Sequence, residues 1–216
     1  MMRDMLKEQN TRNQIPRILS VGESILKEGG FLSDDPGLNP ATGESMRTGK
    51  YRLKDNYTRF YLKYVKPRKP QIEAGSFRFT SLGTLPEWNA VMGLQFENLI
   101  VNNAMSLIPY LHLGNSIVES AAPYRNMRRD AEGVKGGCQI DLLIQTPMTA
   151  YVVEVKRKRE IDESVINEMK DRIARLPLRK DMTPRPVLVY EGDLAPYVEG
   201  SGYFDAVIPA ARLIGR

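Results

Sequence analysis

Two carboxylates and a lysine in the segment 137–159 have residue types and a spacing that suit a divalent-metal site. Twelve residues separate Asp141 from Glu154, and Lys156 follows two positions later. Carboxylate oxygens are the ligands that Mg²⁺ prefers, and an ammonium group stabilises negative charge that develops on a phosphate. A divalent ion held there would lower the pKa of a bound water. The residues therefore favour a metal site.

The two acids lie in arms that have the pattern of short β-strands joined by a turn. β-branched and apolar residues dominate both arms, and Pro147 marks the break between them. Because side chains alternate along a strand, Glu154 and Lys156 share one face. If the arms pair, Asp141 approaches Glu154, and two close carboxylates repel unless a cation or a proton lies between them. The same residues also fit an edge hairpin with a surface Glu-x-Lys pair.

The composition is that of an ordinary soluble protein. The 216 residues include 42% hydrophobic and 26% charged residues, enough for one or two domains with a core. Cys138 is the only cysteine, which excludes an internal disulfide and fits a reducing compartment. His112 is the only histidine, which leaves little for a His-based zinc site. No apolar run reaches the roughly 18 residues that span a bilayer, so we expect a cytoplasmic protein without a membrane partner.

The basic residues are unevenly distributed along the chain. Residues 1–70 hold 14 Lys and Arg against 8 Asp and Glu, whereas residues 71–216 hold 17 against 18. A basic excess confined to one third of the chain favours contact with a phosphate backbone such as that of DNA. It is equally compatible with a surface that only keeps the protein soluble.

The first third has the order of elements of a winged helix. Apolar residues at helical spacing predict a helix from Ile15 to the stop at Gly29-Gly30, followed by strands at 31–33 and 51–53 around a loop rich in Gly, Pro and Asn. The alternative is an ordinary packing helix. If the unit binds DNA, the contacting side chains would come from the helix and the wing: Arg17, Lys27, Arg47, Lys50 and Arg52.

The predicted domains are a winged helix over residues 1–70, a linker over 71–85 and a second domain over 86–216. Asp55 can cap a helix that begins at Asn56, and the aromatic residues of this helix fit a core face better than a stacking surface. The linker is inferred from the Pro and Gly residues that follow this helix.

The second domain reads as αβββαβ, with an added edge strand, in the α/β (α+β) class. Helices are predicted at 88–107 and 161–176, and strands at 116–123, in the two arms of the hairpin, at 186–190 and at 204–208. Glu97 interrupts the apolar first helix, and a buried carboxylate there would need a partner. Arg128, Arg129 and Lys158 could contact phosphate, although runs of charge are more often solvated.

Asp141 and the run Glu154-Val155-Lys156 resemble the motif of the PD-(D/E)XK nuclease superfamily, with Ile140 where a proline often stands. The resemblance implies a restriction-endonuclease-like core in which the lysine positions or activates the attacking water. It also implies that Mg²⁺ (or Mn²⁺) binds to Glu97, Asp141, Glu154 and the carbonyl of Val155.

A wider resemblance covers most of residues 15–210. The runs YRLKDNYTRFY at 51–61 and GLQFE at 93–97, together with the acidic motif, are similar to the C-terminal region of prokaryotic AAA-type ATPases, in which a winged helix and a nuclease-like domain follow the ATPase module. This chain shows no ATPase module. The resemblance implies an ATPase subunit as a partner beside DNA, and an oligomer is compatible with it.

These observations lead to an expected function and two alternatives. We expect a metal-dependent DNA endonuclease that the winged helix brings to DNA, with Asp141, Glu154 and Lys156 as catalytic residues. One alternative is a non-catalytic module that keeps a nuclease-like fold and binds DNA or an ATPase. The other is a transcription regulator that acts through its winged helix alone.

Overall fold

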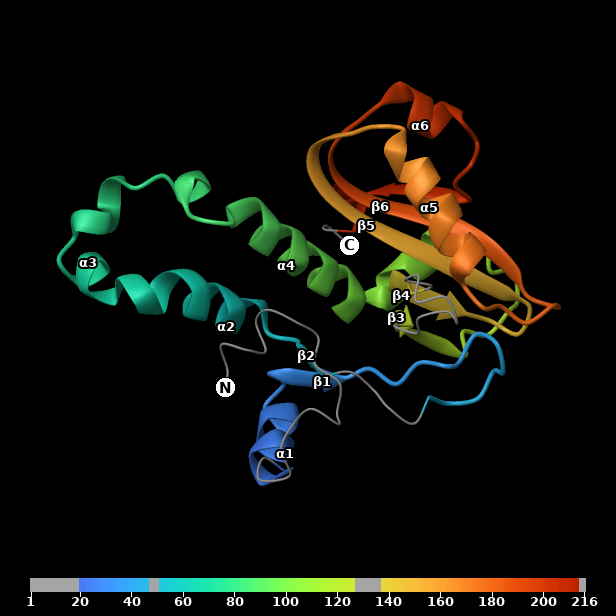
Figure 1. The fold of residues 1–216 in the computed structure, drawn as a ribbon, viewed down its shortest axis with the longest axis horizontal. Coiled ribbons are helices and arrows are strands. Elements are labelled where there is room, and N and C mark those ends of the chain that lie inside the picture. Colours follow the sequence, from blue (N-terminus) through green and yellow to red (C-terminus); the bar gives the residue numbers. More distant parts are fainter. Residues whose placement is uncertain (1–19, 47–50, 127–136, 214–216) are drawn as a thin grey trace. The chain divides into compact units, whose positions relative to one another are not determined.

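The structure is a computed structural model that describes residues 20–46, 51–126 and 137–213. The described residues form a mixed α+β fold with one two-stranded and one five-stranded sheet (Figure 1). They divide into two compact units: 20–36 with 51–99, and 37–46 with 100–213. No helix in these described ranges is both long and apolar enough to cross a membrane.

The first unit begins with a helix and an antiparallel pair of strands. Helix α1 (Ser20–Glu28) ends where the N–H of Phe31 donates to the carbonyl of Leu26, with Gly30 at a φ of 73°. This left-handed residue is the helix stop that the Gly-Gly pair predicts. Strand β1 (Leu32–Asp34) then pairs with β2 (Tyr51–Leu53). The predicted order of helix, strand and strand is therefore present.

Helices complete the first unit. Asp55 caps α2 (Asn56–Phe60) by accepting the N–H groups of Tyr57 and Thr58, as its position predicts. The helix continues as a π-helix over Tyr61–Val65 and a 3-10 turn over Lys66–Arg68 into α3 (Lys69–Glu73). Short 3-10 turns then lead to α4 (Trp88–Asn102). A core of aromatic rings joins these helices, since the ring centroid of Tyr64 lies 5.6 Å from that of Phe60 and 5.5 Å from that of Trp88.

The division of the chain differs from the predicted one in two places. The segment 71–85 contains helical turns and lies inside the first unit, and the boundary falls within α4, between Leu99 and Ile100. The loop predicted as a wing contributes residues 37–46 to the second unit. There the N–H of Leu38 donates to Ser120 Oγ at 3.3 Å, and the carbonyl of Pro40 accepts the N–H of Arg179 at 3.0 Å.

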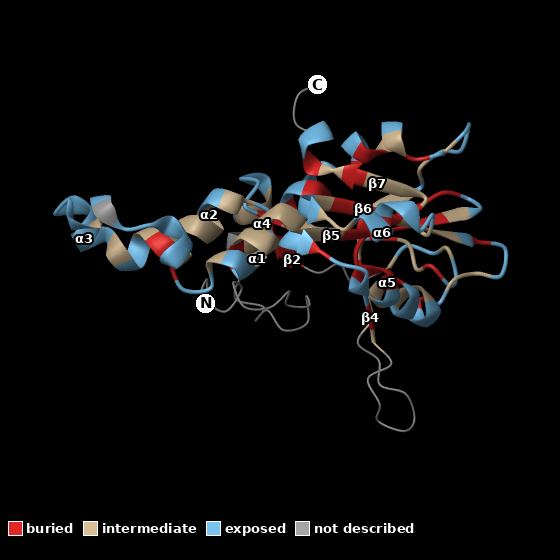
Figure 2. Cartoon of the chain, turned by 90° about the horizontal axis from the view of Figure 1, so that it is seen from above, coloured by how far each residue is buried: buried red, intermediate tan, exposed pale blue. Residues whose placement is uncertain are grey.

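A five-stranded sheet in the order β3-β4-β5-β6-β7 forms the centre of the second unit. The pairs β3–β4 and β4–β5 are antiparallel, whereas β5–β6 and β6–β7 are parallel. Figure 2 shows that the strand interiors are buried. The elements and their bounds are β3 (Ser120–Asn126), β4 (Cys138–Gln145), β5 (Thr149–Ile161), α5 (Ser164–Arg175), β6 (Thr183–Leu194), α6 (Pro196–Gly200) and β7 (Ala206–Pro209).

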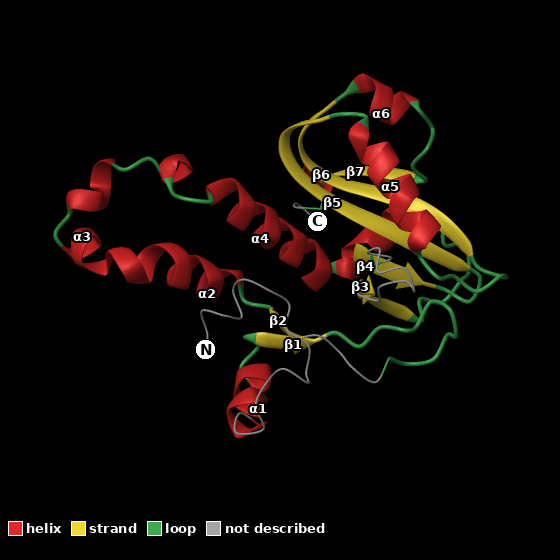
Figure 3. Ribbon diagram, viewed as in Figure 1, coloured by secondary structure: helices red, strands yellow, loops and turns green. Residues whose placement is uncertain are grey.

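Helix α5 lies across one face of this sheet (Figure 3). Its buried residues Val165, Ile166 and Met169 belong to one core cluster with Val152 of β5 and Leu188 of β6. Even-numbered positions of β5 around Val152 therefore face α5, because side chains alternate along a strand. This is the face on which the sequence places Glu154 and Lys156.

Strand β5 is longer than predicted and contains a bulge. It continues to Ile161 beside β6, with a register shift between Arg157 and Glu160. Opposite this shift Gly192 has a φ of 129°, and a Cβ there would lie 1.7 Å from the carbonyl oxygen of Lys158. Only glycine fits this close approach of two backbones.

Candidate functional site

The hairpin of β4 and β5 brings Asp141 and Glu154 together. The ladder pairs Leu142 with Val153, so the next step of the register sets Asp141 opposite Glu154. The described ladder ends with the pair Leu142–Val153. Just beyond it, the N–H of Val155 donates to Asp141 Oδ2 at 2.9 Å. The acid pair therefore marks the position where the two strands part.

Lys156 lies beside Glu154 on the same face, as strand alternation predicts. Its Nζ is 2.8 Å from Glu154 Oε1 and 2.6 Å from Oε2 of Glu168, a residue of α5. The ammonium group thus bridges a buried carboxylate of the strand and a half-exposed carboxylate of the helix.

Arg172 of α5 completes the group of charges. One of its guanidinium nitrogens, Nη1, contacts Glu154 Oε2 directly and lies 3.9 Å from Asp141 Oδ1. Because a single nitrogen is close to both acids, the two carboxylates lie on the same side of the sheet. Three acids (Asp141, Glu154 and Glu168) and two bases (Lys156 and Arg172) form one network, which we call the acidic network.

Burial governs the electrostatics of this network. Glu154 is 2% exposed and Asp141 8% exposed, so both have lost most of their hydration. Burial raises the pKa of Asp141 above its ordinary value, while the Val155 N–H, Arg172 and Lys156 oppose the shift. Burial outweighs these opposing contacts at this carboxyl.

The acidic network fits a divalent cation by the chemistry of its donors. The oxygens of Asp141 and Glu154 converge from two strands, and hard oxygen donors are the ligands that Mg²⁺ and Mn²⁺ accept. Within the described ranges no three His, Cys, Asp or Glu side chains are grouped closely enough to hold a metal together. The cation that now contacts both carboxylates is Arg172, so a metal would take over a position that a guanidinium holds.

The other two predicted metal ligands are Glu97 and the carbonyl of Val155. Glu97 lies on α4 in the part that belongs to the first unit. Burial lowers the pKa of the Arg59 guanidinium, and the negative charge of Glu97 opposes this shift. Asp141 belongs to the second unit. Val155 is adjacent to the network, and its N–H is bonded to Asp141.

The predicted nucleic-acid contacts other than Arg52 divide into three groups. Lys158 is exposed on β5. Lys27 is partly buried, with Nζ 3.2 Å from Asp34 and 3.3 Å from the hydroxyl of Tyr51. The remaining candidates apart from Arg52 lie outside the described residues: Arg17, Arg47, Lys50, Arg128 and Arg129.

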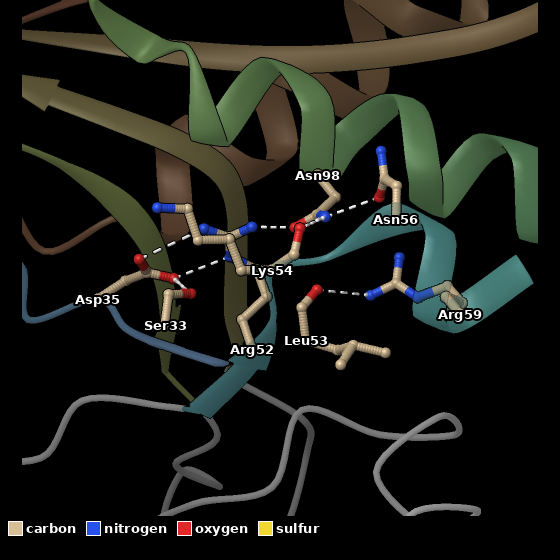
Figure 4. Close-up of polar contacts among 8 residues, drawn as sticks. All are labelled: Ser33, Asp35, Arg52, Leu53, Lys54, Asn56, Arg59 and Asn98. Atoms are coloured by element: carbon tan, nitrogen blue, oxygen red, sulfur yellow. Dashed lines mark hydrogen bonds and ion pairs between the residues drawn. The ribbon is translucent and has the colours of Figure 1, made fainter. Parts of the chain in front are cut away.

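Arg52 occupies an interior position in the first unit (Figure 4). It is 7% exposed; its Nε donates to Asp35 at 2.8 Å, and its Nη1 contacts Asn98 of α4. The amide of Asn98 in turn donates to the carbonyl of Lys54 and to Asn56, both at 2.7 Å. The guanidinium predicted to contact DNA from the wing thus ties β2 to the helices, which makes it a structural residue.

Glu168 and Arg172 are members of the network that the sequence reasoning missed. Both lie at helical spacing from the buried positions of α5, three residues after Val165 and three after Met169 respectively. A charged residue next to the buried stripe of a helix is a usable signal, because it reaches the same sheet face as the apolar residues. The spacing of the apolar residues by itself predicts only the core face of the helix.

Comparisons with known proteins identify no family for this chain. No family model matches it, and no curated protein matches it. Among solved structures, protein VC1899 from Vibrio cholerae is similar, with a TM-score of 0.43 and 12% sequence identity. The match covers 94% of this chain and 41% of the other, so the chain spans less than half the length of that protein.

Proposed function

We propose that the second unit is a metal-dependent nuclease with a restriction-endonuclease-like core. One observation carries the proposal: Asp141 and Glu154 converge where β4 and β5 part, and Lys156 lies 2.8 Å from Glu154 on the same face. The order α4, β3, β4, β5, α5 and β6 along the chain supports it, because it is the αβββαβ order that the resemblance implies.

Each residue of the network has a role in this proposal. Asp141 and Glu154 would hold Mg²⁺ or Mn²⁺, and the carbonyl of Val155 is a candidate third ligand. The metal, when bound, would lower the pKa of the attacking water and polarise the phosphodiester. Lys156 would orient that water, and Glu168 would hold the lysine in place through the 2.6 Å contact.

The first unit is the proposed route to DNA. The order of α1, β1 and β2 and the basic excess of residues 1–70 support a winged helix that contacts the phosphate backbone. An ATPase subunit is a second proposed partner, on the resemblance alone. Arg52 is not part of this proposal, because it is buried within the first unit. Glu97 stays a proposed metal ligand on the resemblance alone.

A cleavage assay tests the nuclease. Supercoiled DNA is incubated with the purified chain and Mg²⁺ or Mn²⁺, with and without chelator. Wild type should cut, and Asp141→Asn and Lys156→Ala should each lower the rate by at least about 100-fold. Matched controls are Glu160→Gln, an exposed acid of the same strand, and Lys180→Ala, an exposed lysine. Cutting that survives in both site variants would belong to a contaminant and would overturn the proposal.

A non-catalytic module is the second candidate, and a specific observation favours it. Lys156 and Arg172 already contact Glu154, so this carboxylate has cationic partners without a metal. Such a module would bind DNA without cutting it, and Asp141→Asn would leave the affinity unchanged. Measuring cleavage and binding on the same preparations separates the two candidates.

A further inference from the structure

Arg172 lies between the buried carboxylates and the solvent. Its side chain is 26% exposed, whereas those of Glu154 and Asp141 are 3% and 10% exposed. Its helix is fixed by the buried residues Val165 and Met169, and its backbone carbonyl accepts the thiol of Cys138 at 3.3 Å. The backbone is therefore anchored, and the long side chain is the part that can move outward.

The position of the guanidinium is the one that a metal bound to the two acids would need. Nη1 contacts Glu154 and lies 3.9 Å from Asp141 Oδ1. Lys156 Nζ instead contacts the other oxygen of Glu154, Oε1, and Oε2 of Glu168. Two cations cannot share the same pair of carboxylate oxygens without strong repulsion.

We propose that Arg172 is a tethered cation that a divalent metal must displace from Asp141 and Glu154. The inference rests on the proposed function for the identity of the metal. Without metal, the guanidinium contacts Glu154, lies near Asp141 and stabilises the apo protein. On metal binding it swings into solvent, and no covalent bond forms or breaks. Arg172 thus lowers the affinity of the site for metal and is a regulatory residue.

If the contact of Arg172 with Glu154 has only a structural role, a different result is expected. Removing Arg172 would then destabilise the protein by taking away one of the two cations at the buried Glu154, and metal would have no effect on the loss. A tethered cation predicts the same loss without metal and its recovery when metal replaces the guanidinium. The two roles therefore differ in the linkage between stability and metal.

The experiment measures Mn²⁺ binding to the full-length chain in the absence of DNA. The electron paramagnetic resonance signal of free Mn²⁺ is followed in titrations of wild type, Arg172→Met and Arg175→Met. The last is the matched control, an arginine of the same helix paired with Asp171 instead. Arg172→Met should bind Mn²⁺ at least about tenfold more tightly than wild type, and Arg175→Met should equal wild type. Equal affinity of Arg172→Met and wild type would overturn the proposal.

Three further measurements keep the test decisive. The double variant Asp141→Asn/Arg172→Met should lose the gain in affinity, which shows that the gain belongs to these carboxylates. Thermal unfolding of Arg172→Met should shift upward with Mn²⁺ by more than that of wild type. If Arg172→Met does not fold, Arg172→Lys decides: a shorter cation holds both carboxylates less well, so tighter Mn²⁺ binding than wild type supports the proposal and equal or weaker binding refutes it.

These results are independent of cleavage. A variant that binds Mn²⁺ more tightly while no form of the protein cuts DNA would support the tethered cation and refute the nuclease. Cleavage by wild type together with an unchanged affinity in Arg172→Met would do the reverse.

Discussion

Asp141 and Glu154 differ in how well the protein compensates their burial. Glu154 contacts two cations, the ammonium of Lys156 and the guanidinium of Arg172. Asp141 has one backbone N–H and a guanidinium nitrogen at 3.9 Å, beyond hydrogen-bonding distance. Its raised pKa follows from this difference, because a buried acid with few charge partners favours the neutral form. Asp141 is thus the carboxylate that would gain most from a metal.

Asp55 illustrates the opposite case of an acid whose charge the fold stabilises. Its carboxylate accepts the hydroxyl and N–H of Thr58 and the N–H of Tyr57, and these bonds lower its pKa. A lowered pKa in the folded state means that the stabilisation is present at neutral pH, above the ordinary value of about 3.9, and is lost as the pH falls through the folded value.

We predict that Asp55→Ala lowers the free energy of unfolding by about 1 kcal/mol at about pH 7, the usual cost of a lost helix cap. The difference from wild type should shrink below about pH 3.9, where the carboxylate begins to protonate. Urea denaturation at both pH values measures it. Asp55→Asn is the control, since an amide oxygen still caps the helix at either pH. An Asp55→Ala variant as stable as wild type at neutral pH would contradict the role of the cap.

At the scale of elements, local patterns predicted the hairpin and its acids well. The alternation of residues and the break at Pro147 located β4 and β5, and the register then set Asp141 opposite Glu154. The inner positions of α5 were also predicted, because an apolar stripe repeats at helical spacing. Both successes depend on interactions between residues that are near in sequence.

Features set by tertiary contacts could not be predicted in the same way. The contact of Arg172 with Glu154 depends on how α5 docks on the sheet, which the sequence of neither element reveals. A helix was predicted from residue 161, yet parallel pairing with β6 extends β5 to Ile161. Pro67 and Pro70 indicated a linker, but proline also fits the first turn of a helix, and both occupy such positions.

Arg52 yields a prediction at this scale because it links β2 to α4 and to the residue after β1. Replacing it by methionine leaves Asp35, whose side chain is 22% exposed, without its charge partner. We expect Arg52→Met to lower the free energy of unfolding by about 2–3 kcal/mol. Fluorescence of Trp88, the only tryptophan, reports unfolding of this unit in urea.

A surface arginine or lysine provides the comparison for Arg52→Met. Lys69 pairs with Glu73 four residues later on α3, and both side chains are 65% exposed. Lys69→Ala should cost less than about 0.5 kcal/mol, because exposed pairs contribute little. Similar losses in the two variants would show that Arg52 has no special role in the interior of the unit.

For the whole molecule, charge is the property that connects the two proposed activities. The N-terminal 70 residues hold 14 basic and 8 acidic residues, while the remainder is close to balanced. A protein that uses this excess to hold DNA releases counterions on binding, so its affinity falls as salt rises. A protein that uses it only for solubility shows no such dependence in a binding assay.

The double variant Arg17→Ala/Lys50→Ala tests this use of the charge. If each side chain contacts one phosphate, the plot of log affinity against log salt should become shallower by roughly 0.9 for each lost contact. Fluorescence anisotropy with a random-sequence duplex at several salt concentrations measures the slope. Lys170→Ala/Lys180→Ala removes the same net charge from exposed positions of the second unit and is the matched control. Equal slopes for the two double variants would mean that net charge alone attracts DNA, and the winged helix would then lose its proposed role as the contact surface.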